Sequence, residues 1–258
     1  MKSNSLAPKL PVQFNSNAHQ MKNSPDNLLD SLYIQLLNQF KMYNSKGNNL
    51  FCSYMSVGQK YQNELLIIGR EPNYWPACFS PVELTNGGEV DVFRTKVINH
   101  ALLGKDSLNP FLNTSYNSIL DPYWCCIKEI VIKLGICKDE TNWSSGIALT
   151  YLYKIAYSSN RYLPKKSRKM QFEHCREILH HELLLLRPKR VLFLTGMKHA
   201  QDFLYLSDCS GLEDCVCPLG DFDYEFDKVK TVVSVHPKKY HRKELVDLIL
   251  AGFRGMPI

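Results

Sequence analysis

Four short, largely apolar runs are the feature that most constrains the fold of this chain. They span residues 65–68, 147–152, 191–195 and 231–235. Runs of this length without regular polar alternation are typical of strands that are covered on both faces. Segments with helical periodicity separate them, so right-handed crossovers would bring the strands together in parallel. The sequence therefore predicts an α/β fold, a three-layer α/β/α sandwich with a central, mostly parallel four-stranded sheet.

Helical periodicity marks the segments around these runs. At the start of the segment 26–43, Asp26 is placed to cap the first turn, and Ser167 has the same place before a helix that runs to residue 186. Residues 208–227 are acidic and rich in turn residues, which predicts an irregular connection. Further helices are predicted at 93–103, 122–132, 200–206 and 242–253.

The composition is that of an ordinary globular chain. Of its 258 residues, 45% are apolar and 22% are charged, so the core should be large enough to fold without covalent staples. Residues 1–25 are rich in Asn, Ser, Lys and Pro, and we expect a disordered or loosely attached arm there. Residues 26–258 would then form a single domain. We find no signal peptide and no apolar run of membrane-spanning length, so we expect a cytoplasmic protein.

Cysteine usage and glycine motifs bear on cofactors. The nine cysteines are scattered and odd in number, which favours reduced thiols. Neither Cys125-Cys126 nor Cys215-Val216-Cys217 has the spacing of a zinc or iron–sulfur site. The glycine-rich dinucleotide motif and the phosphate-loop motif are both absent from the sequence. We therefore expect no metal and no cofactor.

Two strand ends carry residues with catalytic potential. The run 65–68 leads into Gly69-Arg70-Glu71-Pro72, and the run 231–235 leads into His236-Pro237. Ligands of open parallel sheets bind outside the carboxyl ends of the strands. A carboxylate and an imidazole could therefore face one crevice, which suits the cleavage of a bond in a nucleic acid.

Basic residues form two clusters in a chain whose formal net charge is +6. Lys238 and Lys239 stand beside Tyr240, directly after the predicted strand end. The other cluster consists of Lys165, Lys166, Arg168 and Lys169. Such clusters either contact the phosphates of a nucleic acid or form a solvated face, and the sequence leaves both alternatives open.

Four segments, in order, resemble the uracil-DNA glycosylase superfamily. Gly69-Arg70-Glu71-Pro72 resembles the first family motif, and His236-Pro237 resembles the second. Residues 150–154 stand where family members carry a strand-end segment of the type Thr-Asn-Leu-x-Lys. The helix through Cys175, Leu179 and Glu182, followed by 187–196, resembles the long helix and third strand of the family. The resemblance spans about residues 60–255.

The resemblance implies a monofunctional DNA glycosylase of base excision repair, which flips a damaged or deaminated base into a pocket and hydrolyses its N-glycosidic bond. Glu71 would position the attacking water and stabilise the cationic sugar. His236 would donate a hydrogen bond to the base oxygen on which negative charge develops. The substrate-binding turn would comprise Gly69, Arg70, Pro72, Asn73 and Tyr74.

The base-reading position departs from the family pattern. Members that excise uracil commonly read the base with an asparagine, and the corresponding residue is Tyr151. A phenol cannot reproduce the paired donor and acceptor of an amide, which indicates an altered base preference. Asn142, which precedes the strand, is an alternative reader.

The basic clusters would hold the DNA. Lys238, Lys239 and Tyr240 fall where the family inserts a loop into DNA, so we expect a tyrosine wedge with lysine contacts to phosphates. Lys165, Lys166, Arg168 and Lys169 would hold the strand electrostatically. We expect a monomer whose partner is single- or double-stranded DNA.

Two other functions are compatible with the same residues. The missing asparagine favours a non-catalytic nucleic-acid-binding module on this fold. A third interpretation is an α/β enzyme that acts on a small nucleotide-like ligand in a closed pocket, without a role for the basic clusters.

Overall fold

A computed structural model of the chain describes residues 25–43, 50–72, 78–79, 121–138, 140–157, 164–204, 216–224 and 227–255. The arm expected over residues 1–25 lies outside these ranges except for Pro25, and so does the helix expected at 93–103.

Four parallel strands form the centre of the sheet, in the order β5-β3-β7-β9. Their bounds are Leu66–Gly69 for β3, Ala148–Tyr151 for β5, Arg190–Leu194 for β7 and Asp227–Ser234 for β9. Every residue of β3 and β5 is buried, as expected for strands covered on both faces. The predicted α/β fold is confirmed, and all four predicted strands belong to its parallel core.

Two antiparallel strands extend this core to a six-stranded sheet. Ser56–Val57 (β2) pairs with β5 at one edge, and Cys217–Tyr224 (β8) pairs with β9 at the other. The prediction of an irregular connection over 208–227 is therefore wrong for the part that forms β8. Its acidic and turn residues are tolerated because β8 is an edge strand, paired on one side only.

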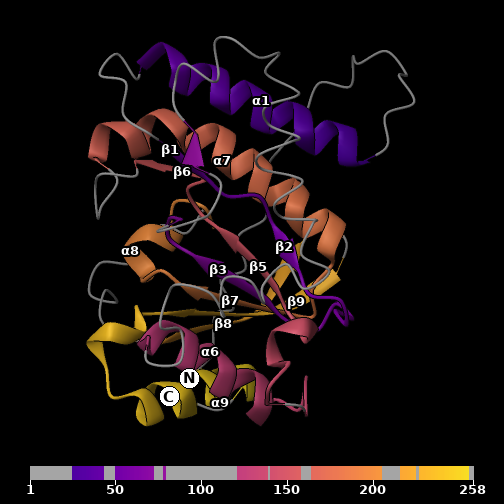
Figure 1. Cartoon of the computed structure of the whole chain (residues 1–258). Helices are drawn as coiled ribbons and strands as arrows, with labels where there is room; N and C mark the ends of the chain where they lie inside the picture. Colours follow the sequence, from indigo (N-terminus) through magenta and orange to yellow (C-terminus); the bar gives the residue numbers. More distant parts are fainter. Residues whose placement is uncertain are drawn as a thin grey trace, which may run out of the picture.

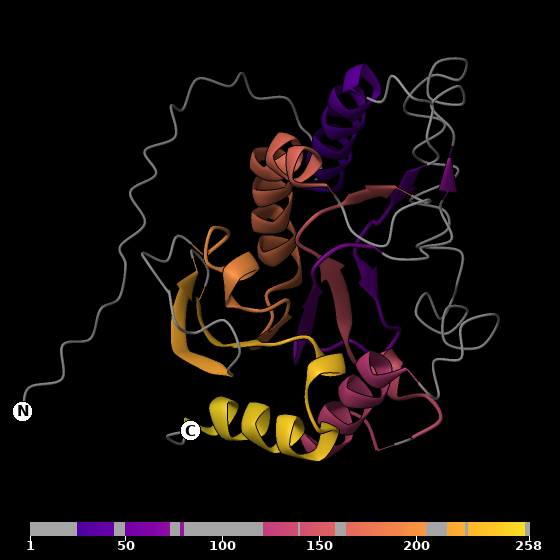
Figure 2. The same ribbon diagram turned by 90° about the vertical axis from the view of Figure 1, so that its left-hand side faces the viewer.

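Helices cover both faces of the sheet (Figures 1 and 2). Pro25–Tyr43 (α1) and Lys165–Leu186 (α7) pack together on one face, while Pro122–Lys133 (α6) and Arg242–Arg254 (α9) cover the other. The short helix α8, Met197–Ala200, follows β7. It begins and ends earlier than the predicted helix at 200–206, because Gly196 with its positive φ of 79° starts the turn directly after the strand.

A small second sheet lies beside α1 and α7. Its strands are Leu50–Cys52 (β1), Cys78–Phe79 (β4) and Ile155–Tyr157 (β6), with β1 in the middle and both pairings antiparallel. Strands of two or three residues carry too little periodicity to be predicted. Because β6 follows β5 closely, this sheet anchors the chain as it leaves the carboxyl end of the main sheet.

The start of α7 differs from the prediction. The helix begins at Lys165, with Pro164 at the N-cap, so Ser167 lies inside the first turn instead of capping it. Its side chain is buried, and its hydroxyl lies 3.3 Å from the hydroxyl of Tyr157. Pro164 has no backbone N–H to satisfy and an extended backbone conformation, so it is compatible with the position before the first turn. The first basic cluster is therefore helical.

Candidate active site

The two predicted catalytic residues lie at the same edge of the sheet. β3, β5, β7 and β9 run parallel, so their carboxyl ends lie together. Glu71 follows the end of β3, and His236 follows the end of β9, with β7 between the two strands. The two residues are 165 positions apart in the sequence, and the sheet brings both to one edge.

The end of β5 holds the turn that carries Glu71. The backbone N–H of Leu152 donates to the carbonyl of Gly69 at 2.8 Å, and that of Tyr153 donates to the carbonyl of Arg70 at 3.0 Å. The first bond belongs to the parallel ladder in which Gly69 lies opposite Tyr151, and the second extends the contact beyond β3. Backbone hydrogen bonds from the end of β5 therefore position the turn.

Glu71 is buried and paired with its neighbour. Its side chain is 3% exposed, and a carboxylate oxygen lies 2.9 Å from the Arg70 guanidinium. Charged side chains are seldom buried unless they are paired. This acidic group is thus held next to a cation at the edge of a sheet, where it can orient a water or face a developing positive charge.

Tyr151 fills the space beside Gly69. The tyrosine is buried, and a Cβ added to Gly69 would lie only 2.7 Å from its Cδ1 and Cε1 atoms. Only glycine therefore fits opposite this ring. Burial raises the pKa of Tyr151 above its ordinary value, so the phenol stays neutral.

His236 offers a hydrogen-bond donor. Its Nδ1 accepts a bond from the Lys238 backbone N–H at 3.3 Å, at the start of the 3-10 helix η3, Pro237–Lys239. A neutral imidazole that accepts at Nδ1 carries its proton on Nε2. This contact therefore favours the tautomer with the proton on Nε2.

Tyr123, which sequence reasoning missed, packs against His236. Their rings stack at 27° with centroids 5.7 Å apart. The Tyr123 N–H donates to the Asp121 carboxylate at 2.8 Å, which caps α6. The Asp-Pro pair at 121–122 signals a helix start in the sequence, but which residue of that helix meets His236 depends on how α6 packs.

The Tyr123 hydroxyl is buried without a hydrogen-bond partner among the described residues. It lies between the two strand ends, since a Cβ on Gly69 would approach it to 3.0 Å. Burial, followed by the charges of Tyr151, Cys126 and Asp121, raises its pKa well above the ordinary value, so the group is a neutral phenol. One continuous set of contacts at this edge thus joins Gly69, Tyr151, Tyr123 and His236.

The residues at this edge belong to a segment that matches a known protein family. The family model of the uracil DNA glycosylase superfamily matches residues 55–248 of the chain. The chain belongs to the uracil-DNA glycosylase superfamily. A search of curated protein sequences found no match. Membership confirms the resemblance inferred from the four segments and supports a DNA glycosylase-like function.

The two residues predicted as alternative base readers, Tyr151 and Asn142, lie at opposite ends of β5. Tyr151 ends β5 at the edge that carries Glu71. Asn142 instead precedes the amino end of that strand, as N-cap of the 3-10 helix η2, Trp143–Gly146. Asn142 is therefore not at the strand end. Asn73 and Tyr74 lie outside the described residues.

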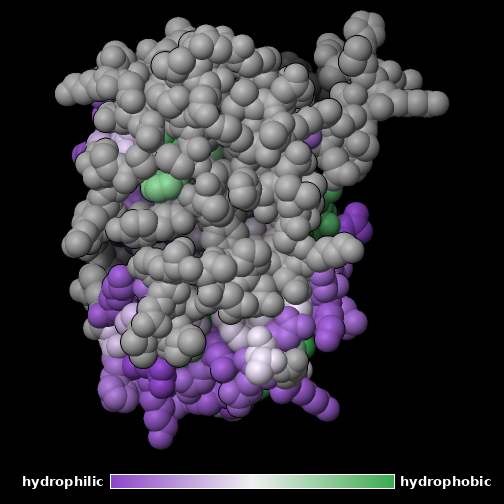
Figure 3. Space-filling view, viewed as in Figure 1, coloured by the Kyte–Doolittle hydropathy of each residue, from purple (hydrophilic) through white to green (hydrophobic). Residues whose placement is uncertain are grey.

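The loop after His236 presents polar and aromatic groups to solvent. Lys238 and Tyr240 are exposed, and the Lys238 ammonium lies 4.0 Å from a carboxylate oxygen of Asp121. A pocket of about 520 Å³ opens between this loop, α6 and α9, lined among others by Pro122, Pro237, Lys238 and Tyr240. The backbone of Lys239 is described, but its side chain is not. Figure 3 shows that the described surface over α6 and α9 is mainly hydrophilic.

The basic cluster on α7 reaches toward the site through Arg168. Lys165, Lys166 and Lys169 are exposed, whereas Arg168 is half-buried with its guanidinium 3.5 Å from Nδ1 of His199 on α8. Burial, together with the positive charges of Arg70, Arg168 and Lys198, lowers the pKa of His199 to about 4. Burial is the larger cause of this pKa shift, and the three cations near the Arg70–Glu71 turn add to it.

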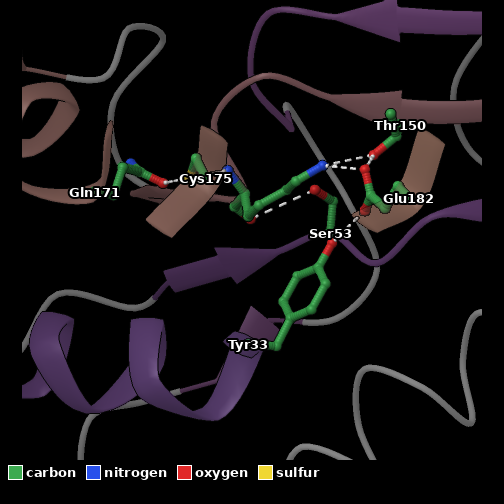
Figure 4. A network of polar contacts seen from close by, with 7 residues as sticks. Tyr33, Ser53, Thr150, Gln171, Cys175 and Glu182 are labelled. Atoms are coloured by element: carbon green, nitrogen blue, oxygen red, sulfur yellow. Dashed lines mark hydrogen bonds and ion pairs between the residues drawn. The ribbon is translucent and has the colours of Figure 1, made fainter. Parts of the chain in front are cut away.

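A buried polar network supports the strand end from behind (Figure 4). Lys154 and Glu182 are fully buried, and their charged groups lie 2.7 Å apart. Thr150 lies within 2.8 Å of Glu182 and 2.7 Å of the Lys154 ammonium, while the Tyr33 hydroxyl of α1 donates to Glu182 at 2.9 Å. The network ties α1, α7 and the end of β5 together.

The described residues contain no cluster of histidine, cysteine or acidic side chains suited to a metal ion. Within the same ranges, no helix combines the length and apolar character that crossing a membrane requires.

Proposed function

We propose that this protein is a monofunctional DNA glycosylase that hydrolyses the N-glycosidic bond of a flipped-out damaged or deaminated base in base excision repair. The observation that carries the proposal is the placement of Glu71 and His236 at one edge of the sheet, in a chain of the uracil-DNA glycosylase superfamily. DNA is the proposed partner.

The reaction needs two opposite electrostatic functions. As the bond between the base and the sugar C1′ breaks, positive charge develops on the sugar and negative charge on the departing base. The Glu71 carboxylate would stabilise the sugar cation and accept a proton from the water that adds to C1′. The His236 Nε2–H would stabilise the base anion; a preorganised donor of this kind is worth roughly 10²–10³ in rate.

The supporting elements match these functions. Backbone bonds from Leu152 and Tyr153 hold the Glu71 turn, and the Lys238 N–H selects the His236 tautomer. Lys238 and Tyr240 are exposed beside this site, and Lys165, Lys166 and Lys169 are exposed on α7. These residues, with Lys239 and Arg168, are proposed to contact the DNA backbone, with Tyr240 as the wedge.

Base release from oligonucleotides tests the proposal. Oligonucleotides with uracil, hypoxanthine, xanthine or hydroxymethyluracil, single-stranded and paired, would be incubated with the protein and then treated with alkali to cleave abasic sites. We expect cleavage of at least one substrate, and a loss of about 10²–10⁴ in rate for Glu71→Gln.

Glu64→Gln is the matched control. Glu64 precedes the same strand at its opposite end and pairs with Lys189 and Arg190. It should retain the wild-type rate. Equal rates for Glu71→Gln and wild type would refute the assignment of Glu71.

A non-catalytic nucleic-acid-binding module is the second candidate, favoured by Tyr151 at the position of the family asparagine. Salt-dependent binding of the same oligonucleotides without base release from any of them would support it over the glycosylase.

A further inference from the structure

The Tyr123 hydroxyl is a buried polar group that the fold does not use. It has no hydrogen-bond partner among the described residues. Two other tyrosine hydroxyls are partnered: that of the buried Tyr33 donates to Glu182 at 2.9 Å, and that of the half-buried Tyr61 donates to the carbonyl of Leu186 at 3.2 Å. Tyr123 is one of six described residues with a buried side-chain nitrogen or oxygen that lacks a hydrogen-bond partner. Because buried polar groups in native proteins are nearly always hydrogen-bonded, such a group needs an explanation.

The position of this hydroxyl supplies one. It lies beside Gly69, two residues before Glu71, and its own ring stacks on His236. Any group that hydrogen-bonds to it would therefore sit between the two proposed catalytic residues. Tyr151 packs against the same glycine, so the hydroxyl is part of the surface where the family asparagine would stand.

We infer that Tyr123 is a specificity-determining residue whose hydroxyl hydrogen-bonds an oxo group of the base in the active site. The inference deepens the proposed glycosylase function and rests on it. A neutral phenol donates one hydrogen bond and accepts another, so it recognises a single carbonyl oxygen and does not demand the paired donor and acceptor pattern that an amide reads.

The ligand class follows from this chemistry. The site beside Tyr123 would take bases that bear a carbonyl oxygen at the edge that the hydroxyl recognises, whether pyrimidine or purine. It would discriminate weakly at the adjacent ring nitrogen. The stacked ring adds a second effect, since it holds the His236 imidazole at a fixed orientation.

Tyr123→Phe isolates the hydroxyl, because it removes one oxygen and keeps the ring. We expect no loss of thermal stability, since no described residue loses a hydrogen bond. Tyr61→Phe is the matched control with the opposite expectation. It removes a bond to the Leu186 carbonyl, so it should lower the melting temperature and leave base recognition unchanged.

Base recognition is measured with DNA that cannot react. The probes are oligonucleotides with a 2′-fluorinated uracil or hypoxanthine nucleotide, in which the fluorine disfavours the cationic sugar, and an otherwise identical oligonucleotide that lacks the base. The ratio of the two dissociation constants reports contacts to the base alone. Loss of one neutral hydrogen bond should reduce the wild-type preference for the base about fivefold to tenfold in Tyr123→Phe.

The outcomes separate this inference from the proposed function. Wild-type protein that releases no base but prefers a base-containing probe, with the preference reduced in Tyr123→Phe, would refute the glycosylase and retain Tyr123 as a reader. The inference would be overturned if wild type and Tyr123→Phe had the same preference for the uracil and the hypoxanthine oligonucleotide over the one without a base. This holds also if neither protein shows any preference, and even if base release is observed. A lower melting temperature of Tyr123→Phe with unchanged preference would assign the hydroxyl a structural role instead.

Discussion

Two groups of polar side chains adjoin β5, and they differ in how completely the protein satisfies them. Behind the strand, Lys154, Glu182, Thr150 and Tyr33 bond to one another with no access to solvent. At the carboxyl edge, the Tyr123 hydroxyl is buried without a described partner, and the stacked His236 is half-buried. A network whose members are all paired fixes backbone positions, whereas an unpaired donor next to a half-exposed imidazole is suited to a ligand. The first group supports the second, because Thr150 and Lys154 flank the residues that bond to the Glu71 turn.

The largest effect is expected from breaking the satisfied network. Lys154→Met would leave the Glu182 carboxylate buried without its cation, which should lower the free energy of unfolding by about 3–5 kcal/mol. Urea denaturation would measure it. The double variant Lys154→Met, Glu182→Leu should regain part of the loss, since no isolated charge remains buried. A single variant as stable as wild type would show that the network is not needed for folding.

At the active edge, the expected loss is in rate rather than stability. His236→Ala removes the proposed donor to the base and should slow base release by roughly 10²–10³, while DNA affinity and the urea midpoint change little. Single-turnover kinetics would measure the rate. His180→Ala on α7 is the control and should react like wild type. If the two variants are equally active, His236 has no catalytic role.

The packing of the active edge can be tested at Gly69. Gly69→Ala places a methyl group 2.7 Å from the Tyr151 ring, an overpacking that should cost about 1–3 kcal/mol of unfolding free energy. Tyr151→Leu in the same chain should relieve the clash and restore stability. If Gly69→Ala alone is harmless, then Tyr151 moves readily and does not close this part of the site.

The smallest effect concerns the charge around the active edge. The pKa of His199 is about 4 in the folded protein, compared with an ordinary value near 6.5 in the unfolded chain. Between these values only the unfolded chain binds the proton, so stability should fall as the pH falls from about 6.5 to 4 and be unaffected by His199 above that range.

His199→Gln removes this titration. Urea midpoints at pH 7 and pH 5 should therefore differ less for the variant than for wild type. An equal acid shift in both proteins would mean that burial and the neighbouring cations do not hold the His199 imidazole neutral.

Much of the fold was predictable from the sequence, because its determinants are local. The four apolar runs became the four parallel strands, and α1, α6, α7 and α9 lie within three residues of the predicted segments at either end. The edge strand β2 and the small second sheet were not predictable, since strands of two or three residues exist only where a neighbouring strand supplies their hydrogen bonds. The longer edge strand β8 was missed because its acidic and turn residues are typical of an irregular connection.

The candidate site divides in the same way. Glu71 and His236 could be singled out because glycine, proline and apolar runs place them at strand ends, and parallel strands bring their carboxyl ends to one edge. Only the tertiary structure decided that Tyr123 stacks on His236, that Tyr151 packs on Gly69 and that Lys154 pairs with Glu182. These contacts join residues far apart in the chain, and their geometry depends on how helices pack against the sheet, which no local pattern of residues encodes.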